Sequence, residues 1–341
     1  MIRVMNQTLQ MIAEIEPIYF EWTRKLYRPD EFTLKVPLNA HTEQLNHIVW
    51  DNRVATILHK QLSKDYITIK GKEYGFPVFN RISFDLERTD PAESIQKYIV
   101  EANCITPASR QIANFSVESD QGRGASITYT GRYKTLEKVM EEIYYRSELG
   151  WEVLFDASNG FIFTTIEGKD RTTSQSVLPP VIFAEKFGNL FDVVVTDSSL
   201  NFYNVAYVAG EDAISRTIQE VGTATGNNRY ELFVDAQDIK YSSGSAPLIA
   251  KGDEVLEEYG QEVTIDADFT STDSFTYGTD FMIGDLCTVI HEDYQLDLRL
   301  IEAKTVIDTK ETTTFVWGAE PITLKGVIDK KLSLINSGVR V

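Results

Sequence analysis

The chain has 341 residues, of which 43% are hydrophobic and 25% are charged, a composition that is ordinary for a folded globular protein. This length predicts two or three domains with ample material for buried cores. The 51 acidic and 33 basic residues give a net charge of −18, which excludes nonspecific binding to nucleic acid through neutralised phosphates and favours solubility.

Residues 1–88 contain many short stretches in which apolar and polar side chains alternate, the pattern of β-strands. Proline in the segment Arg28–Glu31 presets a turn between two such strands. We expect Trp22 and Phe32 to face inward across this turn as core anchors. Many short strands with polar turns predict a first β-barrel domain over residues 1–88, completed by strands from residues 177–210.

Residues 89–176 change to a helical period and predict a small α+β domain inserted into the β-rich chain. Asp90 and Glu93 have the spacing of a capping box, with proline at the first helical position. A second helix should begin at Thr135 and end before Gly150. A hairpin should follow, formed by residues 151–155 and 161–165.

Residues 177–321 return to β patterns and predict a second β-barrel domain. The run 202–209 is apolar on both faces, so a strand there should be covered on both sides. The pattern also predicts a hairpin between residues 215–221 and 230–234, and a helix over residues 247–259. Residues 322–341 contain no further hydrophobic domain and are expected to form a C-terminal tail.

No group of residues has the spacing of a metal site. The four histidines, His41, His47, His59 and His291, lack the helical spacing of a zinc motif. Three acids, Asp266, Asp268 and Asp273, are spaced as in a calcium loop, but Tyr277 stands where the bidentate acid belongs. We therefore expect no metal ligand, and a polar turn at the three acids.

Signals for catalysis or cofactor binding are equally weak. The segment Gly122–Gly124 is too short for a phosphate-binding loop, and a serine nucleophile elbow is absent. Cys104 and Cys287 cannot form a disulfide framework, which favours synthesis in a reducing compartment. We predict no catalytic, cofactor-binding or metal-binding residues, no signal peptide and no membrane segment. The abundance of acids leaves an acid pair for glycoside hydrolysis open.

Five stretches, in order along residues 15–302, carry a resemblance to a known family. They are Trp22–Pro37, Gly168–Thr172, the run Phe187–Leu190 with Tyr203–Gly210, Arg229–Asp235, and Tyr277–Leu286. Together they resemble the tail-associated (Tal-like) baseplate hub proteins of siphophages and prophages. Each stretch alone is a weak signal, whereas the ordered set is specific.

The resemblance implies a mainly β, α+β fold with two tube-type β-barrel domains and an inserted small α+β domain. It implies a structural tail-tip protein without enzymatic activity that caps the distal tail tube, forms a trimeric ring around the DNA path and links it to the host-recognition tip. The implied partners are two further copies, the distal tail protein, the tape-measure protein and tip or receptor-binding proteins. The implied location is the virion tail tip, after synthesis in the bacterial cytoplasm.

Two alternative functions are a host-surface protein and a cytosolic binding module. The first is a β-rich enzyme or binding protein directed at carbohydrates of the host surface, which clustered exposed aromatics beside paired acids would favour. The second is an ordinary cytosolic binding module, which no sequence feature supports.

Overall fold

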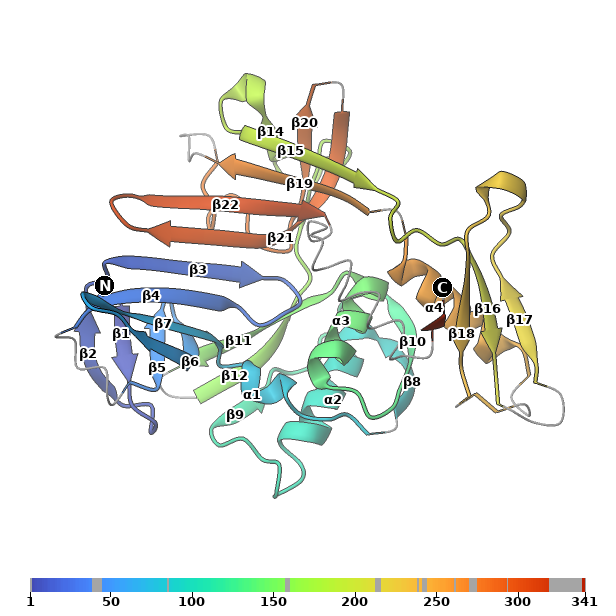
Figure 1. Cartoon of the computed structure of the whole chain (residues 1–341), viewed down its shortest axis with the longest axis horizontal. Coiled ribbons are helices and arrows are strands. Elements are labelled where there is room, and N and C mark those ends of the chain that lie inside the picture. The colour runs from blue at the N-terminus through green and yellow to red at the C-terminus, as the bar shows by residue number, and fades with distance from the viewer. Residues whose placement is uncertain are drawn as a thin grey trace. The chain divides into compact units, whose positions relative to one another are not determined.

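The computed structural model describes residues 2–38, 45–84, 86–156, 160–211, 216–237, 239–240, 244–260, 262–269, 275–292, 294–318 and 339–340 (Figure 1). The chain forms two compact units. The first consists of Met1–Val193 and Asp266–Trp317, and the second of Val194–Ile265 and Gly318–Val341. The chain therefore leaves the first unit along β15 (Phe191–Ser198) and returns to it along β19 (Glu262–Phe269).

A 14-stranded sheet dominates the first unit, so the chain is mainly β, as predicted. Its path runs in the order β15, β19, β22 (Glu311–Gly318), β21 (Tyr294–Ile307), β3 (Tyr19–Lys25), β4 (Glu31–Pro37), β7 (Tyr66–Glu73), β6 (Arg53–Leu62), β5 (His47–Trp50), β1 (Ile2–Met5) and β2 (Met11–Ile15). Off this path, β20 (Leu286–His291) pairs with β21 and takes β13 (Asp170–Arg171) and β14 (Ile182–Ala184) as parallel neighbours.

The N-terminal strands and a strand near the end of the described chain lie side by side. β3 pairs antiparallel with β21, and Figure 1 shows β3 and β4 between β21 and β7. The strands from residues 177–210 that join this sheet, β14 and β15, pair instead with β20 and β19. The sheet is thus assembled from segments far apart in the sequence.

The core beneath the N-terminal strands follows directly from their alternation. Every second residue of β4 is buried, beginning with Phe32. In the antiparallel register Trp22 lies opposite Phe32, with their rings stacked at 6.0 Å between centroids. Both side chains are buried, which confirms the prediction that they anchor this core. Trp50 packs against Trp22 from β5 with 5.6 Å between ring centroids.

A small α+β layer follows in the chain. It contains α1 (Phe76–Phe79), β8 (Leu86–Pro91), α2 (Ala92–Cys104), β9 (Phe115–Val117), β10 (Ser126–Gly131), α3 (Leu136–Ser147), β11 (Gly150–Asp156) and β12 (Gly160–Ile166). β8 pairs with β10, while β11 and β12 form the predicted hairpin and β9 adds to β12. Apolar side chains of α2 and α3 share one core with Trp151 and Phe163 of the hairpin.

The ends of the two helices differ in how well they were predicted. Thr135 caps α3 as expected, its side chain accepting a hydrogen bond from the backbone N–H of Lys138. The predicted capping box at Asp90 is wrong. β8 continues its pairing with β10 through residue 91, so Asp90 stays extended and its carboxylate pairs with Arg88 instead. α2 consequently begins without a side-chain cap.

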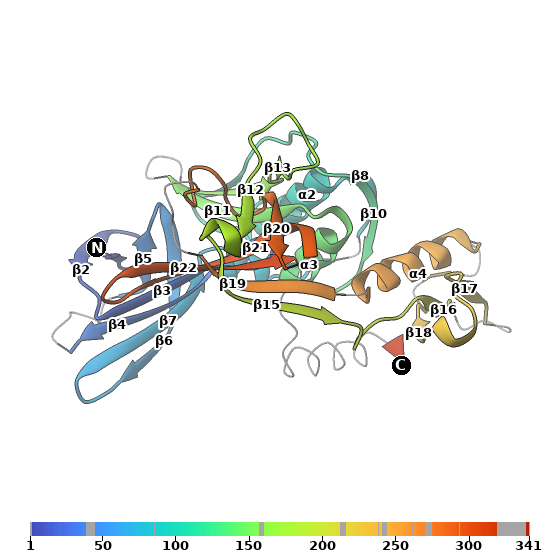
Figure 2. The ribbon, with the colours of Figure 1, turned by 90° about the horizontal axis from the view of Figure 1, so that it is seen from above.

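The second unit is a four-stranded sheet covered by one helix. Its order is β17 (Ile218–Val221), β16 (Val205–Ala209), β18 (Glu231–Asp235) and β23 (Val339–Arg340), and α4 (Ala246–Glu258) lies along β16 in Figures 1 and 2. Ala206 and Val208 of β16 pack beneath Leu248 and Val255 of α4. A short 3-10 helix occurs in this unit at Gly226–Asn228, and another in the first unit at Glu185–Phe187. Apart from β23, the expected tail over residues 322–341 lies outside the described residues.

The predicted hairpin between residues 215–221 and 230–234 is wrong. β17 and β18 each pair with β16, which lies between them, β17 antiparallel and β18 parallel. A strand that is apolar on both faces is best buried at the centre of a sheet, where both its edges are also paired. The prediction for β16 itself, that it is covered on both faces, is consistent with its burial pattern.

Candidate functional site

Five charged side chains, three of them buried and two partly buried, cluster where the large sheet meets the α+β layer. Arg24 comes from β3, Asp30 from the turn before β4, Arg53 from β6, Glu73 from the end of β7 and Glu152 from β11. The side chains of Asp30 and Glu73 are each 2% exposed, and that of Arg53 is 8% exposed. We call these five residues the charge cluster.

The two arginines bridge the three carboxylates. Arg24 lies 3.5 Å from Asp30 through Nε and 3.1 Å from Glu152 through Nη2. Arg53 pairs with Glu152 through Nη2. Its Nη1 lies 3.7 Å from Glu73 and 3.9 Å from Asp30. Both arginines therefore connect strands of the sheet to the hairpin of β11 and β12.

Neutral donors complete the contacts of the buried acids. The indole N–H of Trp22 donates to Asp30 Oδ2 at 2.9 Å, and the backbone N–H of Lys25 donates to Asp30 Oδ1 at 2.9 Å. The backbone N–H of Val153 donates to Glu73 Oε1 at 3.1 Å. Trp22 thus has two functions, because its ring fills the core and its N–H holds the cluster in place.

The charges of the cluster do not cancel when all its groups are ionised, since three carboxylates face two guanidiniums. Burial and the neighbouring charge of Asp30 raise the pKa of Glu73 to about 8, despite the opposing effect of Arg53. Burial acts in the same sense on Glu152, but Arg53 and Arg24 outweigh it and hold the pKa of that carboxyl below its usual range. Glu73 therefore keeps its proton near pH 7, which makes the cluster neutral.

This arrangement is suited to joining two layers and not to hydrolysis. A glycosidase needs two carboxylates on either side of an accessible sugar bond, whereas Asp30 and Glu73 are closed off from solvent and paired with arginines. Sequence reasoning missed this cluster because its members are spread over residues 24–152. The only local signal was the presence of charged residues inside otherwise apolar strand patterns.

A second buried ion pair lies within the α+β layer. Glu93 on α2 pairs with Lys97 at 2.6 Å and accepts hydrogen bonds from the backbone N–H groups of Gln121 and Arg123 at 3.0 and 2.7 Å. The Arg123 side chain bonds to Glu118 at 3.2 Å. These bonds hold the backbone of Gln121 and Arg123 onto α2.

Among the described residues, the histidines and cysteines form no common cluster that could hold a metal ion. His47 is buried on β5, where burial lowers its pKa, and Nδ1 of His291 lies 3.1 Å from Glu185. His59 lies on β6, and His41 lies outside the described residues. Cys104 and Cys287 are free and buried, and burial raises the pKa of both thiols.

Two of the acids spaced as in a calcium loop lie in a strand and not in the expected turn. Asp266 and Asp268 belong to β19, so the prediction of a polar turn there is wrong, while Asp273 lies outside the described residues. Within the described residues no group of three or more His, Cys, Asp or Glu side chains is arranged to hold a metal ion. In the same part of the chain, no helix has the length and apolar character needed to cross a membrane.

Two of the stretches that carry the family resemblance fit directly against each other. The backbone N–H of Lys169 donates to Asp285 Oδ1 at 2.8 Å, and Arg171 pairs with Asp285 Oδ2 at 3.1 Å. Gly168, with φ of +71°, approaches so closely that an added Cβ would lie 1.9 Å from the carbonyl oxygen of Gly284. These stretches therefore pack against each other as scaffold elements.

Comparisons with known proteins agree with the resemblance. The family described as Siphovirus ReqiPepy6 Gp37-like protein matches residues 1–318. No relative was found among curated protein sequences.

Solved structures of prophage tail proteins share the fold. The prophage tail protein gp18 from Listeria monocytogenes EGD-e aligns over 98% of this chain and 99% of its own, with 9% identity and a TM-score of 0.55. The 43 kDa tail protein of prophage MuSo2 from Shewanella oneidensis aligns over 93% and 97%, with 12% identity and a TM-score of 0.56. The tail protein from Neisseria meningitidis MC58 aligns over 94% and 96%, with 12% identity and a TM-score of 0.54.

Proposed function

Because the chain belongs to the siphovirus tail protein family described as Siphovirus ReqiPepy6 Gp37-like protein, it is a structural protein of the tail tip or baseplate, and we propose that three copies form a hub ring around the DNA path. In this proposal the ring caps the distal tail tube and links it to the host-recognition tip. The partners are the distal tail protein, the tape-measure protein and tip or receptor-binding proteins. Synthesis and assembly take place in the bacterial cytoplasm.

The observation that carries the ring is the open sheet of the first unit. Among the described residues, β15 and β2 stand at the two ends of the sheet path, each with a single neighbour. Both edge strands expose apolar side chains, with Phe191 44% and Val194 57% exposed on β15, and Met11 54% and Ile12 38% exposed on β2. An uncovered edge strand presents unpaired backbone N–H and C=O groups that can pair with a strand of another chain. Two different edges that meet between copies make a heterologous contact, which closes into a ring when the rotation fits.

The proposed domain division follows the hub interpretation. Residues 1–88 would supply the first barrel-type domain, residues 89–176 the inserted domain, and residues 177–321 the second barrel-type domain. Completion of the barrels would then involve strands of neighbouring copies in addition to those of one chain.

We also propose that the chain has no enzymatic activity and needs no cofactor. The support for this is the burial and pairing of the acids in the charge cluster, which an enzyme would have to expose. Incubation with purified peptidoglycan should release no fragments. Turnover that disappears when one carboxylate is changed would overturn this part of the proposal.

The decisive experiment for the ring is the mass of the protein in solution together with electron microscopy of the particle. We expect threefold rings with a central channel in the presence of the distal tail protein. A monomer under every condition, with the distal tail protein included, would contradict the proposed hub.

A further inference from the structure

Exposed apolar and aromatic side chains gather at one place on the inserted α+β domain. Ile82, Phe84 and Tyr133 are 42%, 58% and 61% exposed, and the rings of Phe84 and Tyr133 meet edge to face at 6.4 Å between centroids. A β-bridge between Ile82 and Thr135 aligns the backbone around these two residues antiparallel. The backbone N–H of Ser83 donates to the carbonyl oxygen of Lys134 at 2.7 Å. The exposed side chains are therefore displayed by a fixed backbone.

Guanidinium groups lie over both aromatic rings. The Cζ atom of Arg110 is 5.0 Å from the ring centroid of Phe84, and that of Arg132 is 5.4 Å from the ring centroid of Tyr133. Cations at this distance attract the electron-rich ring face. We call Ile82, Phe84, Arg110, Arg132 and Tyr133 the aromatic–arginine patch.

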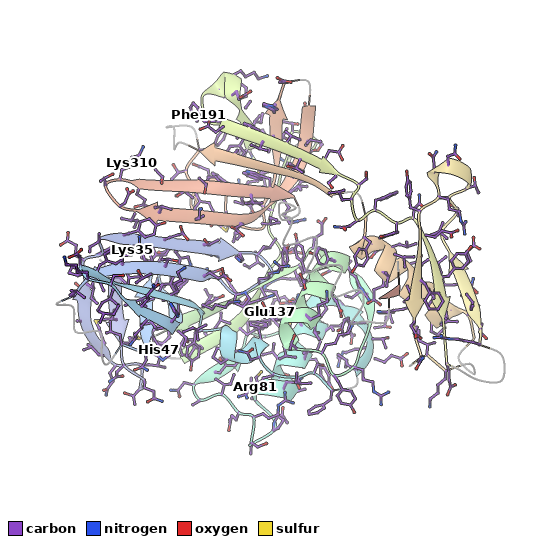
Figure 3. All side chains as sticks on the ribbon, in the orientation of Figure 1. Lys35, His47, Arg81, Glu137, Phe191 and Lys310 are labelled. Carbon is purple, nitrogen blue, oxygen red and sulfur yellow. The ribbon has the colours of Figure 1, made fainter. Side chains whose placement is uncertain are left out.

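Arg110 in the patch and Arg81 beside it are held by hydrogen bonds to neutral oxygens. Arg110 donates to Asn103 Oδ1 and to the carbonyl oxygen of Ile82, both at 2.8 Å, and Arg81 donates to the carbonyl oxygen of Arg110 at 3.4 Å. Among the described residues, neither of these two guanidiniums lies within ion-pair distance of a carboxylate. Figure 3 shows Arg81 at the margin of the helical part of the first unit, far from Lys310.

The backbone of Tyr133 is strained, with φ of +50°. Asn, Asp and Gly adopt this left-handed conformation readily, whereas a bulky residue there is an outlier. Such outliers concentrate at sites where the side chain serves a purpose other than local folding. The aromatic ring of Tyr133 is mostly exposed, so it contributes little to the core that could offset this strain.

Charge complementarity identifies the partner. Residues 81–134 contain seven Lys and Arg and seven Asp and Glu, so the net charge of −18 lies entirely in the rest of the chain. A second copy therefore presents an acidic surface to this neutral, arginine-bearing region. Tyrosine and arginine are also the residue types that are enriched at the energetic centres of protein interfaces.

We propose that the aromatic–arginine patch is the docking surface for an acidic surface of a second copy of this chain. This contact rests on the proposed ring and deepens it, because a patch that meets a different surface of its neighbour is heterologous and propagates around a ring. It places the inserted domain at the contact between copies, in addition to the edges of the sheet.

The test uses sedimentation velocity of the full chain at one ionic strength over a concentration series, with and without the distal tail protein. The main variant is Tyr133→Asn, because asparagine accepts the left-handed backbone while removing the ring. We expect self-association to weaken at least tenfold, the usual effect of truncating a central interface aromatic. The thermal unfolding midpoint should stay unchanged or rise, which a purely structural tyrosine would not show.

Two further variants control the experiment. Phe84→Ser removes the second ring of the patch without relying on the backbone of residue 133. Phe187→Ser is the matched control, because Phe187 is 53% exposed and lies under a cation, Lys186, at 5.1 Å. We expect Phe84→Ser to weaken association and Phe187→Ser to leave it unchanged.

The alternative outcomes separate this inference from the proposed hub. If wild type, Tyr133→Asn and Phe84→Ser associate equally, the patch is no docking surface and the ring stands. If wild type never associates, the ring and the docking surface fall together. If Tyr133→Asn loses only the distal tail protein and still self-associates, the patch binds that protein and the second-copy contact is overturned.

Discussion

Changing Glu73 to glutamine should remove a pH dependence of stability that the charge cluster creates. Glutamine has nearly the shape of a protonated glutamic acid, and its amide oxygen can keep the hydrogen bond from the backbone N–H of Val153. It cannot ionise beside Asp30. The groups that face Glu73 are Asp30, Arg53 and Glu152, with the hydroxyl of Tyr277 at the margin of the same charges.

The sign follows from the raised pKa of Glu73. Below its ordinary pKa of 4.5 the group is protonated in both the folded and the unfolded chain. Between that value and about 8 the folded chain keeps a proton that the unfolded chain has lost, so the free energy of unfolding falls as pH rises. Above about 8 the loss is complete. The full difference corresponds to on the order of 3–5 kcal/mol as an upper bound.

Urea denaturation at about pH 4.5, 6.5 and 8.5, which span the ordinary and the raised pKa of Glu73, measures the effect. The variant and wild type should be closest in stability at the lowest pH, and the advantage of the variant should grow toward the highest. Histidine titration affects both proteins equally and cancels in the difference between them. Glu14→Gln, which alters a half-exposed pair with Arg3, is the control and should leave the pH profile unchanged. Parallel profiles for wild type and Glu73→Gln would refute the assignment of the buried proton.

Three further results are expected. Trp22→Ala should lower the free energy of unfolding by about 3–5 kcal/mol, because it removes a buried ring and an N–H donor to the charge cluster. Trp50→Ala should lower it less, because Trp50 is only partly buried. Denaturant titration of the two variants measures the difference. Gly168→Ala should reduce soluble yield and melting temperature strongly because its Cβ would collide with Gly284, whereas Gly188→Ala, with similar φ and open space, should cost only about 1 kcal/mol. Sedimentation velocity across a salt series should show association rising with ionic strength. Salt screens both the local attraction at the aromatic–arginine patch and the repulsion between whole copies of charge −18, over about 8–10 Å, and we expect the repulsion to be the larger effect; association independent of salt would contradict that reasoning.

Local features of the fold could be predicted from the sequence because they depend on nearby residues. The β11–β12 hairpin follows from alternation on both sides of a turn, and the start of α3 follows from the side chain of Thr135. The inward position of Trp22 and Phe32 follows from the period of their strands. Each of these signals lies within about twenty residues of sequence.

Strand partners could not be predicted in the same way. The pairing of β3 with β21 joins segments separated by most of the chain, and the alternation of either strand is compatible with many partners. The position of β16 between β17 and β18 was also missed. Strands that follow each other in sequence usually pair, as β17 and β18 would, but here each of them pairs with β16. The charge cluster depends on these same pairings, so it became visible only with the fold.

The geometry of the charge cluster suggests what a scaffold protein gains from keeping charged side chains buried or partly buried between its layers. Buried ion pairs rarely add stability over apolar packing, because removing charges from water is costly. They do restrict geometry, because Arg24 and Arg53 satisfy Glu152 on β11 only at one placement of the hairpin against the sheet. The aromatic–arginine patch is carried by the α+β layer, whereas the proposed strand-edge contacts belong to the sheet. A ring that uses both surfaces needs a fixed angle between them, and we infer that the cluster supplies it. Replacement of the five charges by apolar residues should therefore leave the chain folded but impair ring formation, and rings of unchanged stability in such a variant would contradict this inference.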